Sequence, residues 1–173
     1  MKRILIEESD FSYYVDKIIK QESLNKTQKF SKFLEMARNA SIASNFETYK
    51  IGAAIKIKGR TIATGSNSYK THPEQKKYNQ KRSNFDKNAK HFKHAEFTAL
   101  NKLKDVDLKK AEMFIYRTGS DGTARMSRPC AGCMDAIKER GIKVIHYTTS
   151  DGIATEYLSK DVLTLVKKSK RPI

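Results

Sequence analysis

Two short segments of this sequence carry the residue types from which a reactive metal centre is made. His94-Ala95-Glu96 supplies an imidazole and a carboxylate, and Pro129-Cys130-Ala131-Gly132-Cys133 supplies two thiols. Two thiolates and one imidazole form a three-ligand zinc site, which leaves one tetrahedral position for water. Zinc lowers the pKa of that water and makes hydroxide available near neutral pH. We therefore predict one zinc ion per chain, held by His94, Cys130 and Cys133, with Glu96 close enough to exchange protons with the water without being a ligand.

Two other uses of the cysteines are less consistent with the sequence. A C-x-x-C pair in an intracellular protein can be a redox pair or a chance spacing, but a thioredoxin-like pair is expected near the N-terminus and this one lies late in the chain. A structural zinc site takes four protein ligands, usually from a second C-x-x-C. The chain has only two cysteines, so a closed cysteine-rich site is excluded and no disulfide is expected.

Helical patterns indicate how the two segments are positioned. His94 opens a stretch in which Phe97, Leu100 and Leu103 recur at helical spacing. Pro129 fits the first turn of a second helix, which we expect to stop at Gly141. Cys130 would then lie in the first turn, where the helix dipole favours a thiolate. The pattern predicts a metal held between the starts of two helices.

Alternating and periodic segments predict the rest of the core. A helix is expected over 27–43, with Thr27 as its N-cap. Five strands are expected over 49–58, 61–65, 112–117, 142–148 and 153–158. Ser150-Asp151-Gly152 reads as a hairpin turn, so the last two strands should be antiparallel. We also expect a short strand at 4–6 and short helices over 11–19 and 161–168. No catalytic or binding role is assigned to these segments.

An H-x-E segment followed by P-C-x-x-C is the signature of zinc-dependent deaminases, and the sequence resembles the cytidine/deoxycytidylate deaminase superfamily from Phe30 to Leu158. Further matching segments are Ile51-Gly52-Ala53-Ala54, Gly65-Ser66-Asn67 and Gly141-Ile142-Lys143-Val144. Lys70-Thr71-His72-Pro73 and the segment from Tyr147 to Gly152 look most like deoxycytidylate-deaminase-like proteins of bacterial viruses. The antiparallel last strands instead resemble the cytidine deaminase branch, because the deoxycytidylate branch inserts a helix there and pairs the strands in parallel.

The resemblance implies a fold and a set of site residues. The fold would be an α/β protein of three αβα layers around a mixed five-stranded sheet. Glu96 would be the catalytic residue, and Asn67, Ala95 and Ser127 would contact the substrate. For Asn67, the alternative is a turn residue that satisfies its own backbone. The small residues at 52–54 would either form the base of the substrate pocket or allow a helix to pack closely on the strand.

Length and composition indicate the number of domains, the cellular location and the kind of partner. With 173 residues we expect a single deaminase domain over 1–173, with residues 1–25 as an extension. The sequence has no apolar run long enough to cross a membrane, and its apolar start is too short for a signal peptide. We therefore expect a cytoplasmic protein with no membrane partner, and a homo-oligomer. The net charge of +16, from 35 basic and 19 acidic residues, favours either an anionic partner or simply a lysine-rich surface.

Residues 69–93 read as a basic insertion in the form of a long loop that leads into His94. Lysines alternate there with Tyr69, Tyr78, Phe85 and Phe92. The segment could be a lid that attracts a phosphate, a platform on which single-stranded nucleic acid stacks, or a solvated insertion. Its histidines at 72 and 91 are not needed as zinc ligands.

Three functions follow from these observations. The resemblance implies hydrolytic deamination of a cytosine ring, with dCMP as the preferred substrate of a nucleotide enzyme. The alternative is a deaminase that edits bases in single-stranded DNA, RNA or tRNA, which the net charge favours. A non-catalytic zinc-stabilised module is the third, and Glu96 argues against it because a structural zinc site has no use for that carboxylate.

Overall fold

The computed structural model describes residue 21, residues 30–80, residue 88 and residues 90–158. By its backbone contacts the chain divides into residues 1–32 and residues 33–173. Of the first unit, residues 21 and 30–32 are described, and all are helical. The elements expected at 4–6, 11–19 and 161–168, and the cap at Thr27, lie outside the described residues. A single domain over 1–173 therefore stays a prediction.

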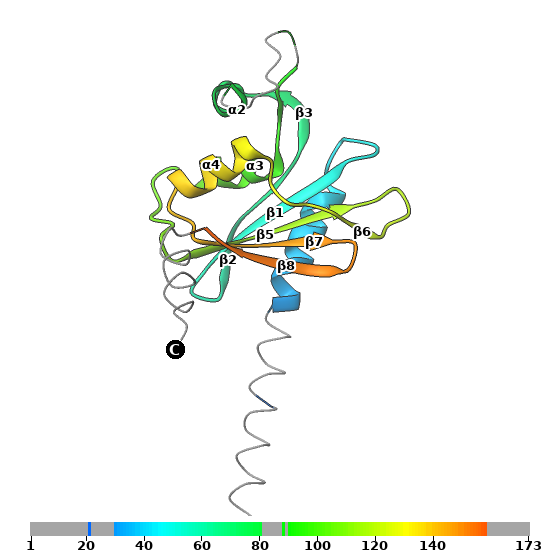
Figure 1. Cartoon of the computed structure of the whole chain (residues 1–173), viewed down its shortest axis with the longest axis vertical. Coiled ribbons are helices and arrows are strands. Elements are labelled where there is room, and N and C mark those ends of the chain that lie inside the picture. Colours follow the sequence, from blue (N-terminus) through cyan, green and yellow to red (C-terminus); the bar gives the residue numbers. More distant parts are fainter. Residues whose placement is uncertain (1–20, 22–29, 81–87, 89, 159–173) are drawn as a thin grey trace, which may run out of the picture. The chain divides into compact units, whose positions relative to one another are not determined.

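A mixed sheet forms the centre of the second unit (Figure 1). Its strands are, in spatial order, β2 (Arg60–Ser66), β1 (Lys50–Ile57), β5 (Ala111–Thr118), β7 (Val144–Thr149) and β8 (Gly152–Tyr157). The short β6 (Ala124–Arg125) pairs with the end of β5. Only β5 and β7 are parallel. The five predicted strands are confirmed, and so is the antiparallel β7–β8 pair, because the two-residue turn between them leaves no room for a crossover helix.

Helices lie on both faces of this sheet. Within the second unit, the helical residues 33–42 cover one face, and α3 (Ala95–Leu100) with α4 (Ala131–Glu139) covers the other (Figure 1). A short 3-10 helix, Asn101–Leu103, continues α3. The expected three layers are thus present. No helix in the described parts of the chain is long and apolar enough to cross a membrane.

The core is packed on each face of the sheet by a different set of side chains. Ile55, Ile115 and Ile145 are fully buried on the face toward α3 and α4, together with Leu100 and Ile137. On the opposite face the Phe33 ring packs on Phe114, with ring centroids 5.3 Å apart. A sheet covered on both faces buries successive residues of its central strands, as the continuous buried runs of β1 and β5 show.

Two glycines allow the helices to approach the sheet. A Cβ on Gly52 would lie 2.0 Å from the carbonyl oxygen of Ala37, and one on Gly65 would lie 2.4 Å from the backbone nitrogen of Ala99. Both positions therefore exclude any side chain. For Gly52 this supports the packing alternative, because its open side faces the backbone of the helical residues 33–42.

The segment expected to be a loop over 69–93 contains regular structure. Strand β3 (Ser68–Thr71) pairs with β4 (Phe92–Lys93), and helix α2 (Pro73–Asn79) follows β3. Pro73 occupies the first helical position, and Nδ1 of the cap residue His72 accepts a hydrogen bond from the Glu74 backbone. The loop prediction was wrong for residues 73–79, because the buried positions of α2 are amides, Gln75 and Asn79, rather than apolar side chains.

Candidate metal centre and active site

The zinc motifs lie at the starts of α3 and α4. His94 is the N-cap of α3 and Cys130 is the N-cap of α4, each with extended backbone. The sequence placed Pro129 and Cys130 inside the first helical turn, and this boundary was wrong by one or two residues. Neither side chain caps its own helix, so both are available to meet between the two helices.

The three predicted ligands converge. Nδ1 of His94 lies 3.2 Å from Sγ of Cys133 and 3.6 Å from Sγ of Cys130. The ligand atoms of all three residues lie within 4.8 Å of one another. Zinc bonds of about 2.3 Å to sulfur and about 2.0 Å to nitrogen, at a tetrahedral angle, would separate the two atoms by about 3.5 Å. The donor set and its spacing therefore fit a tetrahedral zinc ion with one ligand position remaining.

The two thiols differ in their tendency to ionise. A hydrogen bond from Cys133, aided by His94, lowers the pKa of Cys130 to about 3. Burial, together with the hydrogen bond to Cys130, raises the pKa of Cys133 well above its ordinary value. The pair thus holds one thiolate beside one thiol. A metal ligated by both sulfurs would release the remaining proton, because only thiolates are strong ligands.

Glu96 is the second residue of α3 and is buried, with 4% of its surface exposed. Burial raises the pKa of its carboxyl group, and the neighbouring His94 opposes this effect. A carboxyl group with a raised pKa can both accept and return a proton near neutral pH. The position and environment of Glu96 therefore suit proton transfer next to the three ligand atoms.

The residues predicted to contact substrate are all buried, and two already bond the backbone. Oδ1 of Asn67 accepts a hydrogen bond from the Ile51 backbone at 2.8 Å, and Nδ2 donates one to the Tyr49 carbonyl at 2.6 Å. Oγ of Ser127 donates to the Ile115 carbonyl at 3.0 Å. Ala95 is fully buried as the first residue of α3. The substrate contacts of these three residues stay predictions. For Asn67 and Ser127 the geometry shows a structural role, because both side chains hydrogen-bond the backbone.

Two arginines that lie near the cysteine motif have acidic partners. Arg125 bonds Asp121 at 2.7 Å. Arg128, just before the cysteine motif, forms a two-bond pair with Glu156 of β8, with both bonds at 2.9 Å. Both arginines are about half exposed, so the pairs tie local loops together more than they add stability.

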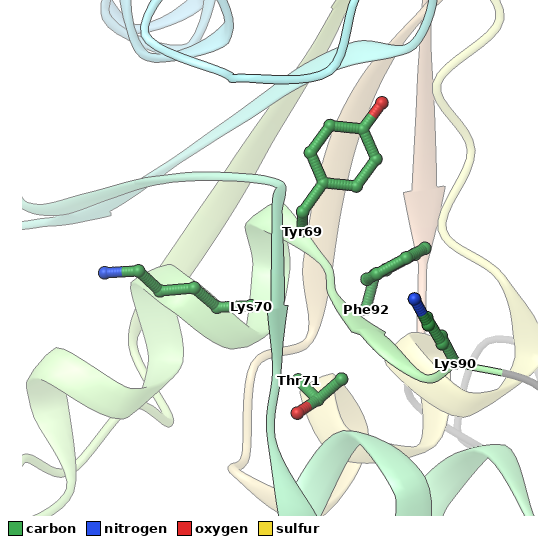
Figure 2. A pocket seen from close by; sticks show the side chains of 5 residues that line it. All are labelled: Tyr69, Lys70, Thr71, Lys90 and Phe92. Carbon is green, nitrogen blue, oxygen red and sulfur yellow. The ribbon is translucent and has the colours of Figure 1, made fainter.

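A basic and aromatic hollow lies beside the start of α3. It is lined by Tyr69, Lys70, Thr71, Lys90 and Phe92 (Figure 2). Phe92 and Lys90 lie on the same side of the hollow, while the Lys70 ammonium group points away from them. The Tyr69 ring stacks on Phe46 at 4.0 Å and meets Phe92 edge-on at 5.2 Å. Phe92 precedes His94 by two residues, so the hollow lies within a short distance of the ligand cluster.

Sequence reasoning missed Gln75 and Asn79, which α2 brings to the ligand cluster. Gln75 is fully buried, and its Oε1 accepts a hydrogen bond from the His94 backbone at 3.1 Å. The available signal was a pair of amides four residues apart behind Pro73, which places both on one helix face.

Comparisons with known proteins agree with this geometry. Residues 27–149 match the family model described as the cytidine and deoxycytidylate deaminase zinc-binding region. A comparison with curated proteins finds no match. Among solved structures, cytidine deaminase from Burkholderia pseudomallei has a TM-score of 0.50 at 16% identity, over 74% of this chain and 91% of that chain. The dCMP deaminase of cyanophage S-TIM5 has a TM-score of 0.49 at 25% identity, over 79% of this chain and 90% of that chain.

The family model spans most of the chain, including both zinc motifs and four of the five main strands. The Burkholderia structure shows the same fold. On these grounds, and with its His94, Cys130 and Cys133 cluster able to hold a metal ion, this chain belongs to the family of zinc-binding cytidine and deoxycytidylate deaminases.

Proposed function

We propose that this protein is a zinc-dependent hydrolytic deaminase that converts dCMP and water to dUMP and ammonia. The observation that carries the proposal is the convergence of three ligand atoms within 4.8 Å beside the buried carboxyl group of Glu96. Three ligands and an adjacent proton-transfer group are what a hydrolytic site needs, whereas a structural zinc site would use a fourth protein ligand.

His94, Cys130 and Cys133 would hold the zinc, which when bound lowers the pKa of water and so supplies a nucleophile near neutral pH. Glu96 takes a proton from the attacking water and delivers it to the ring nitrogen. It then moves the second proton to the exocyclic amine, which leaves C4 as ammonia. The α3 N-terminus fixes Glu96 relative to His94, because both residues lie within the first turn of the helix.

Several features support a phosphorylated substrate. The hollow that precedes His94 carries Lys70 and Lys90, and the net charge of +16 raises the local concentration of anions. Asn67, Ala95 and Ser127 are our proposed contacts to the nucleoside. Substitution of Asn67 or Ser127 should reduce stability as well as activity, because their side chains bond the backbone of the sheet.

The same hollow favours a second candidate, deamination within single-stranded DNA, RNA or tRNA. Tyr69 is 48% exposed, and exposed aromatic rings beside lysines provide stacking and phosphate contacts for unpaired nucleotides. The three rings of Tyr69, Phe46 and Phe92 already contact one another. This packing reduces the ring surface left for stacked bases, so we rank the free nucleotide first.

The deciding experiment is a deamination panel read by mass spectrometry on zinc-loaded protein. The panel contains cytidine, deoxycytidine, dCMP, CMP, their triphosphates, a single-stranded oligonucleotide and tRNA. We expect turnover of dCMP, and no turnover by Glu96→Gln, which should keep its zinc. Turnover of the polymers alone would select the second candidate. A Glu96→Gln variant as active as the wild type would refute the proposed mechanism.

The cellular setting follows from the thiol ligands. Cys130 and Cys133 must stay reduced to bind a metal, which a reducing cytoplasm ensures. We propose that the protein acts there, and a homo-oligomeric assembly stays a prediction that light scattering would test.

A further inference from the structure

Helix α2 contacts the zinc site through one fully buried amide. Oε1 of Gln75 accepts a hydrogen bond from the backbone nitrogen of His94 at 3.1 Å. Its Nε2 donates to Oδ1 of Asn79 at 3.1 Å. One buried side chain thus connects the backbone of a predicted zinc ligand to α2.

Asn79 fixes the orientation of this amide. It lies one turn after Gln75, is nearly buried, and its Nδ2 lies 3.2 Å from Nδ1 of His91. Because Oδ1 of Asn79 can only accept, the Gln75 nitrogen must point toward it, and the Gln75 oxygen must point toward His94. The hydrogen-bond network therefore leaves Gln75 a single orientation.

The fit between α2 and the cysteine loop is close. A Cβ on Gly132, which lies between the two cysteines, would be 3.1 Å from Oδ1 of Asn79 and 3.2 Å from the Tyr78 carbonyl. A side chain at this position would require α2 to give way by a few tenths of an ångström. The helix is thus placed directly against the segment that carries two of the three predicted ligands.

Holding α2 in place does not require a buried amide. Tyr78 already attaches α2 to both helices, since its ring packs on Phe97 at 5.2 Å and its hydroxyl donates to Glu139 at 2.5 Å. An unpaired buried amide would cost about 1–3 kcal/mol, and an apolar side chain would avoid that risk. The buried amide at position 75 is therefore explained better by its hydrogen bond to the His94 backbone than by packing.

We propose that Gln75 is a positioning residue for the zinc ion, resting on the metal site of the proposed function. It holds His94 through the backbone N–H, while Asn79 keeps the amide oriented. Hydrogen bonds of this kind to metal ligands typically change metal affinity by about 10–100-fold.

The test compares Gln75→Leu and Gln75→Glu with Tyr78→Phe as a matched control. Gln75→Glu keeps the size of the side chain but replaces the donor to Asn79 with an oxygen, so it removes the hydrogen bond that orients the group facing His94. Tyr78→Phe removes a different hydrogen bond between α2 and α4. Zinc affinity is measured by competition with a chromophoric chelator. The visible spectrum of the Co²⁺-loaded protein reports the thiolate–metal bonds.

We expect both Gln75 variants to bind zinc about 10–100-fold more weakly and to shift the thiolate–cobalt band, while Tyr78→Phe matches the wild type in both measurements. If Gln75→Leu does not fold, the near-isosteric Gln75→Glu decides alone. Wild-type affinity and an unshifted band in Gln75→Glu would overturn the positioning role and leave the proposed function intact. A wild-type protein that binds no zinc would instead refute the proposed function itself.

Discussion

Substitution of Gly65 by alanine should disturb the zinc site from the opposite side of α3. Gly65 lies in β2, and its α-carbon faces the backbone of α3. A Cβ there would lie 2.4 Å from the nitrogen of Ala99 and 2.5 Å from the carbonyl oxygen of Ala95. Both contacts are backbone atoms of the helix whose first turn carries His94 and Glu96, so the helix itself must move.

The size of this movement follows from the distances. Ordinary contacts of a Cβ begin near 3.4 Å, so α3 must shift away from the sheet by about 1 Å. Overpacking of this kind costs about 1–3 kcal/mol or more, and each kcal/mol lowers Tm by about 2–4 °C in a protein of this size. A 1 Å displacement of a catalytic group can reduce the rate by about 100-fold.

Gly52→Ala is the matched control, because its Cβ would meet the helical residues 33–42 on the other face of the sheet. We expect both variants to lose several degrees in Tm, but only Gly65→Ala to bind zinc more weakly, measured by chelator competition. Refutation would come from a Gly65→Ala protein with wild-type Tm and zinc affinity. Equal loss of zinc affinity in both variants would also refute it, since the effect would then not depend on α3.

Three further predictions concern other contacts. Asn67→Ala removes two partly buried hydrogen bonds, to the backbone of Ile51 in β1 and of Tyr49 just before it. It should destabilise the protein by about 1–3 kcal/mol, read from the urea midpoint; an unchanged midpoint would contradict the contacts. Burial lowers the pKa of His146, so the unfolded chain binds the extra proton first and stability should fall as pH drops below about 6.5. Between pH 8 and 5.5, the Tm of the His146→Gln variant should depend less on pH than the Tm of the wild type. Equal slopes for the two proteins would refute the assignment of this pH dependence to His146. Removal of metal by a chelator should lower Tm in the wild type and leave a Cys130→Ser variant nearly unaffected, because that variant lacks a ligand.

The zinc motifs and the strands could be predicted because their signals are local. The alternation of Ile51, Ala53 and Ile55 places them on one face of β1, and the structure buries Ala53 and Ile55 fully and Ile51 partly. The two-residue turn before β8 similarly predicts that β7 and β8 pair in antiparallel orientation, which the structure shows. In each case a few neighbouring residues contain all the information that the prediction needs.

Other features depend on contacts between distant segments and were not predictable. The buried positions of α2 are Gln75 and Asn79, whose burial makes sense only beside His94 and Gly132. The amide of Asn67 bonds the backbone of a neighbouring strand. Arg128 meets Glu156 across 28 residues of sequence. Hydrophobic periodicity contains no signal for a polar side chain satisfied by a remote partner.

The order of the zinc ligands along the chain has a consequence for folding. His94 and Cys130 are separated by 36 residues, and β5, the central strand of the sheet, lies between them. A metal ion bound to both residues would close a loop around that strand. A cross-link of this length that persists in the unfolded chain reduces the entropy of that chain, and so stabilises the folded state by about 4 kcal/mol. While the ion stays bound, opening should begin at the edge strands β2 and β8, and β5 should leave the sheet only after the metal dissociates.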